Sequence, residues 1–201
     1  FTTPEDLAQR TGLAIDAYEG LAASGSLLPV GLDRRDGMWT AGMLTELGPD
    51  RLSLPAGDGV PPLKEMNQQE QVQADLWSTG ISTTHPVSLA RAALTDHGCL
   101  SIDAVLADRR HGTRARVGGI ITHRQRPGTA RGGRFLNRED ETGLLKVVVL
   151  PQVGEAHYEI ARKAVGVVIG GVLEYRDGVT NLVAHRFEQW PVDGIASRDF
   201  R

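Results

Sequence analysis

The chain has little of several features that define common protein classes. Its one cysteine, Cys99, excludes an intrachain disulfide and a cysteine-rich zinc site among the 201 residues. No apolar run approaches the roughly 18 residues that cross a membrane. The first residues also lack the basic-then-apolar order of a signal peptide. These absences predict a cytoplasmic protein with no membrane partner. Because the chain begins with Phe1 and enters a capped helix at once, we expect it to be part of something longer, with any catalytic centre upstream.

Acidic residues are missing from one stretch of the chain. Residues 109–138 hold nine arginines and two histidines but no aspartate or glutamate. Residues 1–110 carry 8 Lys+Arg against 15 Asp+Glu, a net of −7, whereas residues 111–190 carry 12 against 8, a net of +4. Like charges without interleaved acids repel unless a partner neutralises them. The pattern predicts an anion-binding surface, and nucleic acid is the expected anion.

The first half of the sequence predicts short helices. Thr3 is placed to cap a helix that begins at Pro4, and Gly25 to end a second helix over about 14–24. Further helices are expected from Asp33, over 67–78 and over 86–97, and Ser101 is expected to cap a last one. The turn at residues 10–13 resembles a helix-hairpin-helix turn, although it holds one glycine, Gly12, where two are usual. Two interpretations stay open there: a phosphate contact through the hairpin amides, or plain helix packing.

The second half changes to the two-residue period of β-strands. Five strands are expected, with a helix over 151–163 between the third and the fourth, and the strand ranges are 114–126, 133–140, 143–150, 164–176 and 179–187. This is the element order of an OB-fold, a Greek-key barrel whose second and third strands and end loops bind oligonucleotides or oligosaccharides. The predicted class is α+β, a helical N-terminal region followed by a five-stranded OB-fold. The expected segments are a helix-hairpin-helix-like region, a linker, a helical connecting region, the OB-fold domain and a tail, at residues 1–47, 48–62, 63–110, 111–190 and 191–201.

The candidate nucleic-acid-binding residues follow from this arrangement. On the first strand, simple alternation places the arginines on one face with Thr122, opposite Ala115, Val117, Ile121 and His123, unless Gly118-Gly119 introduce a bulge. Phe135 would offer a stacking platform with Asn137 beside it, next to the basic loop 127–133. The alternative is that Phe135 packs in the barrel and the arginines form solvated surface pairs with the acidic helical half of the chain. The full candidate set is Arg114, Arg116, Arg124, Arg126, Arg131, Arg134, Phe135, Asn137, Arg138, Lys146 and Arg176.

Other chemistry finds less support in the residue pattern. Glu139, Asp140 and Glu141 are hairpin acids that alternate between faces, so turn chemistry is expected rather than a metal site. The scattered histidines form no metal motif or catalytic triad, and no catalytic residue is predicted. The segment 73–77, QADLW, is similar to peptides that dock on bacterial sliding clamps, but it falls inside a predicted helix.

Taken together, these segments resemble a known family. The run 135–143, FLNREDETG, followed by three valines at 147–149, resembles the OB-fold signature of bacterial C-family DNA polymerases. Upstream, the run 77–80, WSTG, with His85-Pro86 is similar to the segment before that domain. Residues 1–36 are similar to the tail of the family's helix-hairpin-helix region. These motifs are most similar to those of the error-prone, ImuC-type branch of alpha-subunit homologues.

This resemblance implies a role without chemistry of its own. The family's catalytic aspartates would lie before Phe1, so the nucleotidyltransferase activity and its Mg²⁺ belong to a preceding portion, and no cofactor is expected in this segment. The implied role is to bind single-stranded template DNA and to dock a damage-induced, translesion polymerase onto an ImuB-like accessory protein. Arg138 stands where the family usually has leucine, so either the local register differs or one more cation joins the binding face.

Two alternatives remain from the sequence. In the first, the segment is a protein interaction module and its contact with DNA is incidental. In the second, it is the OB-fold of another nucleic-acid enzyme such as a synthetase or helicase.

Overall fold

The computed structural model describes residues 1–47, 49, 60–128 and 132–191 and divides the chain into two compact units, Phe1–Thr83 and Thr84–Arg201. The five-segment division expected from composition stays a prediction. Its linker lies mostly outside the described residues, as does most of its tail. No helix in the described part of the chain is long and apolar enough to cross a membrane.

The first unit is helical, as its sequence predicts. Thr3 caps its first helix by accepting from the amide of Asp6 at 3.1 Å, and Gly12 ends it with φ 57°. A core formed by Leu7, Tyr18, Leu27 and Leu44 joins the first three α-helices. The elements are α1 (Pro4–Thr11), α2 (Ile15–Ala23), η1 (Leu28–Val30), α3 (Arg34–Glu46) and α4 (Gln68–Ser78).

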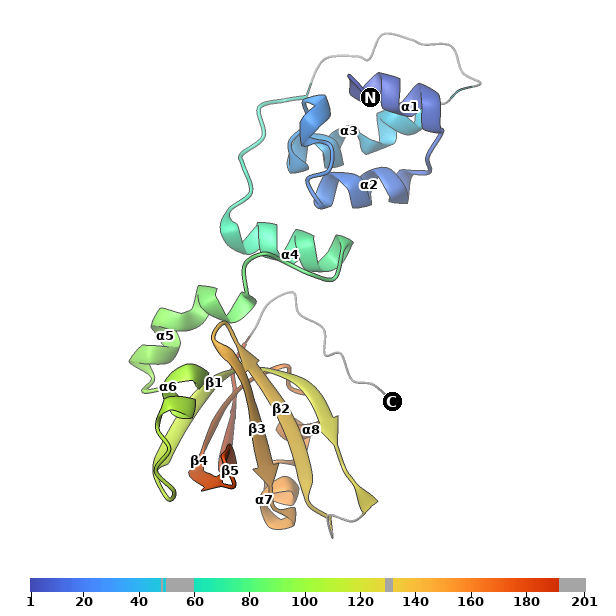
Figure 1. Ribbon diagram of the computed structural model, residues 1–201. Helices are drawn as coiled ribbons and strands as arrows, with labels where there is room; N and C mark the ends of the chain where they lie inside the picture. Colours follow the sequence, from blue (N-terminus) through green and yellow to red (C-terminus); the bar gives the residue numbers. More distant parts are fainter. Residues whose placement is uncertain (48, 50–59, 129–131, 192–201) are drawn as a thin grey trace. The chain divides into compact units, whose positions relative to one another are not determined.

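The second unit is a closed five-stranded barrel with the strand order β1-β2-β3-β5-β4 (Figure 1), which confirms the predicted OB-fold. The strands are β1 (Arg114–Gln125), β2 (Arg134–Asp140), β3 (Gly143–Val149), β4 (Gly166–Arg176) and β5 (Val179–Gln189). The predicted single helix between β3 and β4 is instead two short helices, α7 (Pro151–Ala156) and α8 (Tyr158–Lys163), which meet at His157. Both contribute side chains to the barrel core.

The segment before the barrel packs on it. It contains η2 (Pro86–Ala90), α5 (Arg91–Asp96) and α6 (Ile102–Ala107), where the sequence predicts a single helix for the first two. Ile102 and Val105 enter the barrel core, and Val87 and Leu94 form a smaller cluster with Cys99 and Val168. Residues 84–107 are therefore built into the second unit.

The strand register has one irregularity that the sequence misplaces. β1 pairs with β4 without interruption from Arg114 to Ile120, so no bulge lies at Gly118-Gly119. The shift occurs between Ile121 and His123, in the pairing with β2. The two glycines instead allow close packing. A Cβ on Gly118 would lie 2.3 Å from the Leu94 side chain, and one on Gly119 would lie 2.4 Å from the Glu139 carbonyl oxygen.

Candidate nucleic-acid interface

Three predicted site residues share the outside of β2 and β3. Phe135 and Asn137 alternate with the buried Leu136 and Arg138, so they point out of the barrel. Lys146 on β3 lies directly opposite Asn137, and its Nζ is 4.6 Å from the centroid of the Phe135 ring. The alternative that Phe135 packs inside the barrel is wrong, because the inward positions belong to its neighbours. We call Phe135, Asn137 and Lys146 the outer face.

The register shift in β1 moves Arg124 away from the face that simple alternation predicts. Arg124 pairs with the inward-facing Leu136, whereas His123 pairs with Asn137. The guanidinium of Arg124 donates to the carbonyl of Ala161 at 2.9 Å and to that of Ala164. Arg124 therefore binds the last carbonyls of α8, where a cation offsets the negative end of a helix.

Arg126 is exposed just after β1, and Arg134 begins β2. Arg131, in the loop between these strands, lies outside the described residues. Arg126 and Arg134 border a cavity of about 210 Å³ beside α8, and Arg124 borders it as well.

The remaining predicted cations lie elsewhere. Arg114 and Arg116 occupy the half of β1 that pairs with β4, and Arg116 forms a 3.1 Å ion pair with Glu188. Arg176 lies at the β4–β5 hairpin, 3.6 Å from Asp177. The predicted cations thus lie on several parts of the barrel, and only some of them are near the outer face.

Arg138 has to be removed from the surface set, because its side chain is 0% exposed. It donates to the carbonyls of Val117 at 2.6 Å and of Val167 at 2.8 Å. Burial lowers the pKa of its guanidinium to about 9. Of the two outcomes that the sequence leaves open, a further cation on the binding face is therefore wrong.

The acids of the β2–β3 hairpin form a structural junction. The buried Asp140 accepts from the amides of Ile102 at 2.9 Å and Thr142 at 2.8 Å and from Arg91 Nη2 at 2.8 Å. Arg91 also binds Glu141, and this contact is the first cause of the raised pKa of Arg91. The predicted cap Ser101 makes no capping bond to α6, whose first amides bond to Asp140 and Thr142 instead. Within the described residues no cluster of three metal-ligating side chains occurs.

Two residues beside the basic strands were missed by sequence reasoning. Tyr158 and Arg162 lie one turn apart on α8, and Arg162 Nη1 donates to the Tyr158 hydroxyl at 3.0 Å. The guanidinium carbon of Arg134 lies 5.2 Å from the centroid of the same ring, and that of Arg162 lies 5.7 Å from it. The i,i+4 spacing of an aromatic and an arginine on the predicted helix was the available signal.

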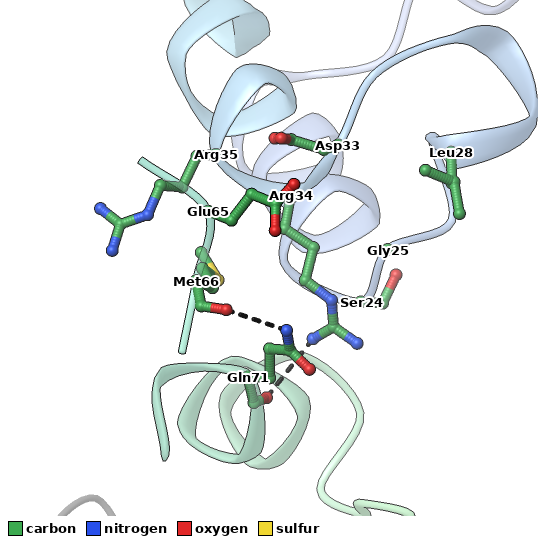
Figure 2. A pocket seen from close by; sticks show the side chains of 9 residues that line it. All are labelled: Ser24, Gly25, Leu28, Asp33, Arg34, Arg35, Glu65, Met66 and Gln71. Carbon is green, nitrogen blue, oxygen red and sulfur yellow. Dashed lines mark hydrogen bonds between the residues drawn. The ribbon is translucent and has the colours of Figure 1, made fainter. Parts of the chain in front are cut away.

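The first unit has its own cavity of about 310 Å³, shown in Figure 2. Its two arginines are engaged by carboxylates: Arg34 binds Asp75 at 2.7 Å, and Arg35 binds Glu70 at 2.6 Å. Figure 2 also shows Gln71 donating to the Met66 carbonyl at 3.0 Å. Both arginines of the cavity are therefore held by internal pairs, and none of the other described residues that line it is a cation.

The clamp-like segment is helical, because residues 73–77 fall within α4. Asp75 in that segment is bound by Arg34 and by the Ser82 hydroxyl, at 2.7 and 2.8 Å. An extended peptide would have to break these contacts.

Curated relatives match the whole chain. A protein named error-prone DNA polymerase from Corynebacterium efficiens is 37% identical over 205 residues, and the one from Mycobacterium tuberculosis is 37% identical over 204. The namesake from Cutibacterium acnes is 40% identical over 206 residues. Each alignment covers 100% of this chain but only 18–19% of the relative, so the chain spans about a fifth of their length. The helices and the barrel match together, which the synthetase or helicase alternative does not explain.

No family model matches the chain. Among solved structures, asparaginyl-tRNA synthetase from Pyrococcus horikoshii in complex with asparaginyl-adenylate is 24% identical, with a TM-score of 0.40 over 49% of this chain and 23% of that one. The S. pombe Stn1-ten1 complex is 19% identical, with a TM-score of 0.33 over 38% of this chain and 57% of that one. These likenesses are too weak for a functional conclusion.

Proposed function

We propose that this chain, a homologue of the C-terminal part of bacterial error-prone DNA polymerases, binds single-stranded template DNA through the outer face of its barrel. The parent protein would act in the cytoplasm as a damage-induced, translesion polymerase. Its Mg²⁺-dependent nucleotidyl transfer would take place in a different portion of the protein.

The observation that carries this proposal is the placement of Phe135. Its ring is half-buried on the outside of β2, with the Lys146 ammonium over it at 4.6 Å from the centroid and the polar Asn137 on the same side of the strand. Any base can stack on an aromatic face, and a neighbouring cation can bind the phosphate that follows that base. The charge of the barrel region supports the same partner, since residues 111–190 carry 12 basic against 8 acidic residues.

The test is fluorescence anisotropy of a labelled single-stranded oligonucleotide, titrated with the chain at several salt concentrations. Phe135→Ala should weaken binding by about 1–3 kcal/mol, or roughly 5–150-fold, if one base stacks on the ring. The slope of log affinity against log salt should stay the same, because stacking involves no counterion. Lys146→Gln should instead lower the slope by about 0.7, the value for one phosphate contact on a single strand.

Matched controls use the same chemistry away from the barrel face. Trp39→Ala removes an exposed aromatic on α3, and Arg110→Gln removes an exposed cation paired with Asp108. Both should bind the oligonucleotide as the unchanged chain does. Binding that is insensitive to Phe135 and Lys146 would contradict the proposal.

A second candidate function is docking of a protein partner, favoured by exposed apolar side chains on the first unit. Trp77 is 64% exposed and Ile81 is 71% exposed, at and just beyond the end of α4. Large exposed aromatics are typical of recognition surfaces. The partner would be an ImuB-like accessory protein or, if α4 unwinds, a sliding clamp. Calorimetry with each purified protein tests this, since Trp77→Ala should abolish the heat of binding and leave oligonucleotide affinity unchanged.

A further inference from the structure

We propose that the cavity between α8 and the ends of β1 and β2 binds one phosphodiester group of the single-stranded DNA that lies on the outer face. This inference rests on the proposed function and names a second contact for the same ligand. We call the cavity the arginine pocket. It is lined mainly by Arg124, Arg126, Arg134, Tyr158 and Arg162.

The pocket has a surplus of positive charge. In the part of the chain that the structure describes, Arg126, Arg134 and Arg162 have no carboxylate at ion-pair distance, and none of the residues lining the pocket is acidic. The nearest acid along the helix, Glu159, is bound by Lys163 at 2.7 Å. Arg124 already offsets the carbonyl groups at the end of α8. Among the described residues, the concave site therefore holds three arginines that have no carboxylate partner, which favours an anion.

Tyr158 fixes the orientation of two of these arginines. Arg134 and Arg162 both lie against its ring, at 5.2 and 5.7 Å from the centroid. The hydroxyl oxygen accepts from Arg162 at 3.0 Å, which leaves the phenolic hydrogen for an acceptor. A phosphate oxygen can therefore meet guanidinium donors and one hydroxyl donor that are held in place before binding.

The lining of the pocket favours a phosphate group. Its volume of about 210 Å³ has room for one phosphate with part of its hydration shell. The guanidinium groups and the Tyr158 hydroxyl around this space are the donors that phosphate oxygens accept from.

The pocket lies on the other side of the β1–β2 sheet from the outer face, at the end where these two strands stop. Arg134 and Leu136 line it from the inward side of β2, whereas Phe135 between them points outward, and Gln125, which also lines the pocket, is the pairing partner of Phe135. A DNA strand that stacks a base on Phe135 and then passes around this end of the sheet would bring one of its phosphates to the pocket entrance. The geometry assigns the two sites to neighbouring parts of one ligand.

The experiment is an oligonucleotide scan in which a single phosphate is replaced by an uncharged methylphosphonate. With the unchanged chain, anisotropy should show weaker binding for substitution at one position more than at its neighbours. In Arg134→Gln/Arg162→Gln that sensitivity should disappear, and the salt slope should fall by about 0.7. Arg110→Gln is the matched control and should keep both properties. Should the double variant fail to fold by circular dichroism, the exposed Arg126→Gln is measured instead, with the same expectation.

The outcomes separate the pocket from the outer face. If the unchanged chain binds the oligonucleotide and the pocket variant keeps the slope and the sensitivity, the pocket proposal is overturned while the proposed function stands. If the unchanged chain binds no oligonucleotide, the proposed function fails. The pocket is then tested with inorganic phosphate against chloride at equal ionic strength, by ¹⁹F spectra of the fluorotyrosine-labelled chain. A phosphate-specific shift of the Tyr158 signal, assigned with Tyr158→Phe, supports the pocket, and no shift overturns it.

Discussion

Replacing Asp140 by asparagine should destabilise the barrel, and the loss of stability should not depend on whether Mg²⁺ is present. The carboxylate is fully buried and accepts from the Ile102 amide, the Thr142 amide and hydroxyl, and Arg91. An asparagine amide offers one acceptor oxygen and turns an NH₂ group toward donors on its other side. Hydrogen bonds to a charged group contribute about 1.5–3 kcal/mol each, and loss of two of them costs about 3–6 kcal/mol.

The neighbouring position supplies the control. Glu139→Gln makes the same chemical change one residue away, on the outward side of β2, where Glu139 lies 3.5 Å from His85 and its side chain is 37% exposed. Ion pairs at that exposure contribute about 0–1 kcal/mol, so this variant should unfold close to the unchanged chain. The comparison isolates burial, because residue type and sequence position hardly differ.

Urea unfolding measures both variants in the full chain. Trp39 and Trp77 are exposed in the first unit and can be replaced by phenylalanine, which leaves Trp190, packed against His97 in the second unit, as the fluorescent reporter. The midpoint should fall for Asp140→Asn with an unchanged slope, and millimolar Mg²⁺ should shift neither curve. Equal midpoints for the two variants, or stabilisation by Mg²⁺ that Asp140→Asn removes, would refute the structural role.

Four further predictions concern buried parts of the second unit. Arg138→Met should change the free energy of unfolding by less than about 1 kcal/mol because it removes a buried charge together with its hydrogen bonds, whereas Arg138→Lys keeps the charge with fewer donors and should cost about 3 kcal/mol. Because the pKa of Arg138 is lowered to about 9 in the folded chain, the unfolded chain holds more protons above that pH, so stability to urea should rise from pH 8 to pH 10 relative to Arg138→Met. Gly119→Ala places a Cβ 2.4 Å from the Glu139 carbonyl oxygen and should lower barrel stability by roughly 1–3 kcal/mol, while Gly20→Ala, with open space around it, should not. Burial raises the pKa of the Cys99 thiol, so an aromatic disulfide reagent should label it at pH 8 only after urea unfolds the barrel.

The sequence predicts the fold well because its signals are local. Strand alternation and the turns at Gly143 and Asp177-Gly178 place all five strands within about two residues of their observed ends. The register shift after Ile121 is not local, because it depends on the pairing of β1 with β2. It places Arg124 on a different side of β1 from the one that simple alternation predicts. The interior position of Arg138 likewise depends on neighbouring strands. A charged residue in a basic run favours the surface until its carbonyl partners on β1 and β4 are known.

The cap of α6 shows why one strong motif was hard to interpret. Ser101 has the residue type and position of an N-cap, but its hydroxyl bonds to Asp103. The helix amides bond instead to Asp140 and Thr142, which lie almost forty residues later in the chain. The hairpin sequence EDET therefore joins two segments of the second unit, which a local analysis of turn chemistry cannot show.

The two sides of β2 make stability and binding separable. Between residues 135 and 140 the even positions hold Leu136, Arg138 and Asp140 inside the barrel, and the odd positions hold Phe135, Asn137 and Glu139 outside. Substitution at Leu136 or Asp140 should lower stability and leave the salt slope of the remaining folded chain unchanged. Substitution at Phe135 or Asn137 should change oligonucleotide affinity at constant stability. If binding followed the even positions instead, loss of the fold would explain it, and the outer face would have no specific role.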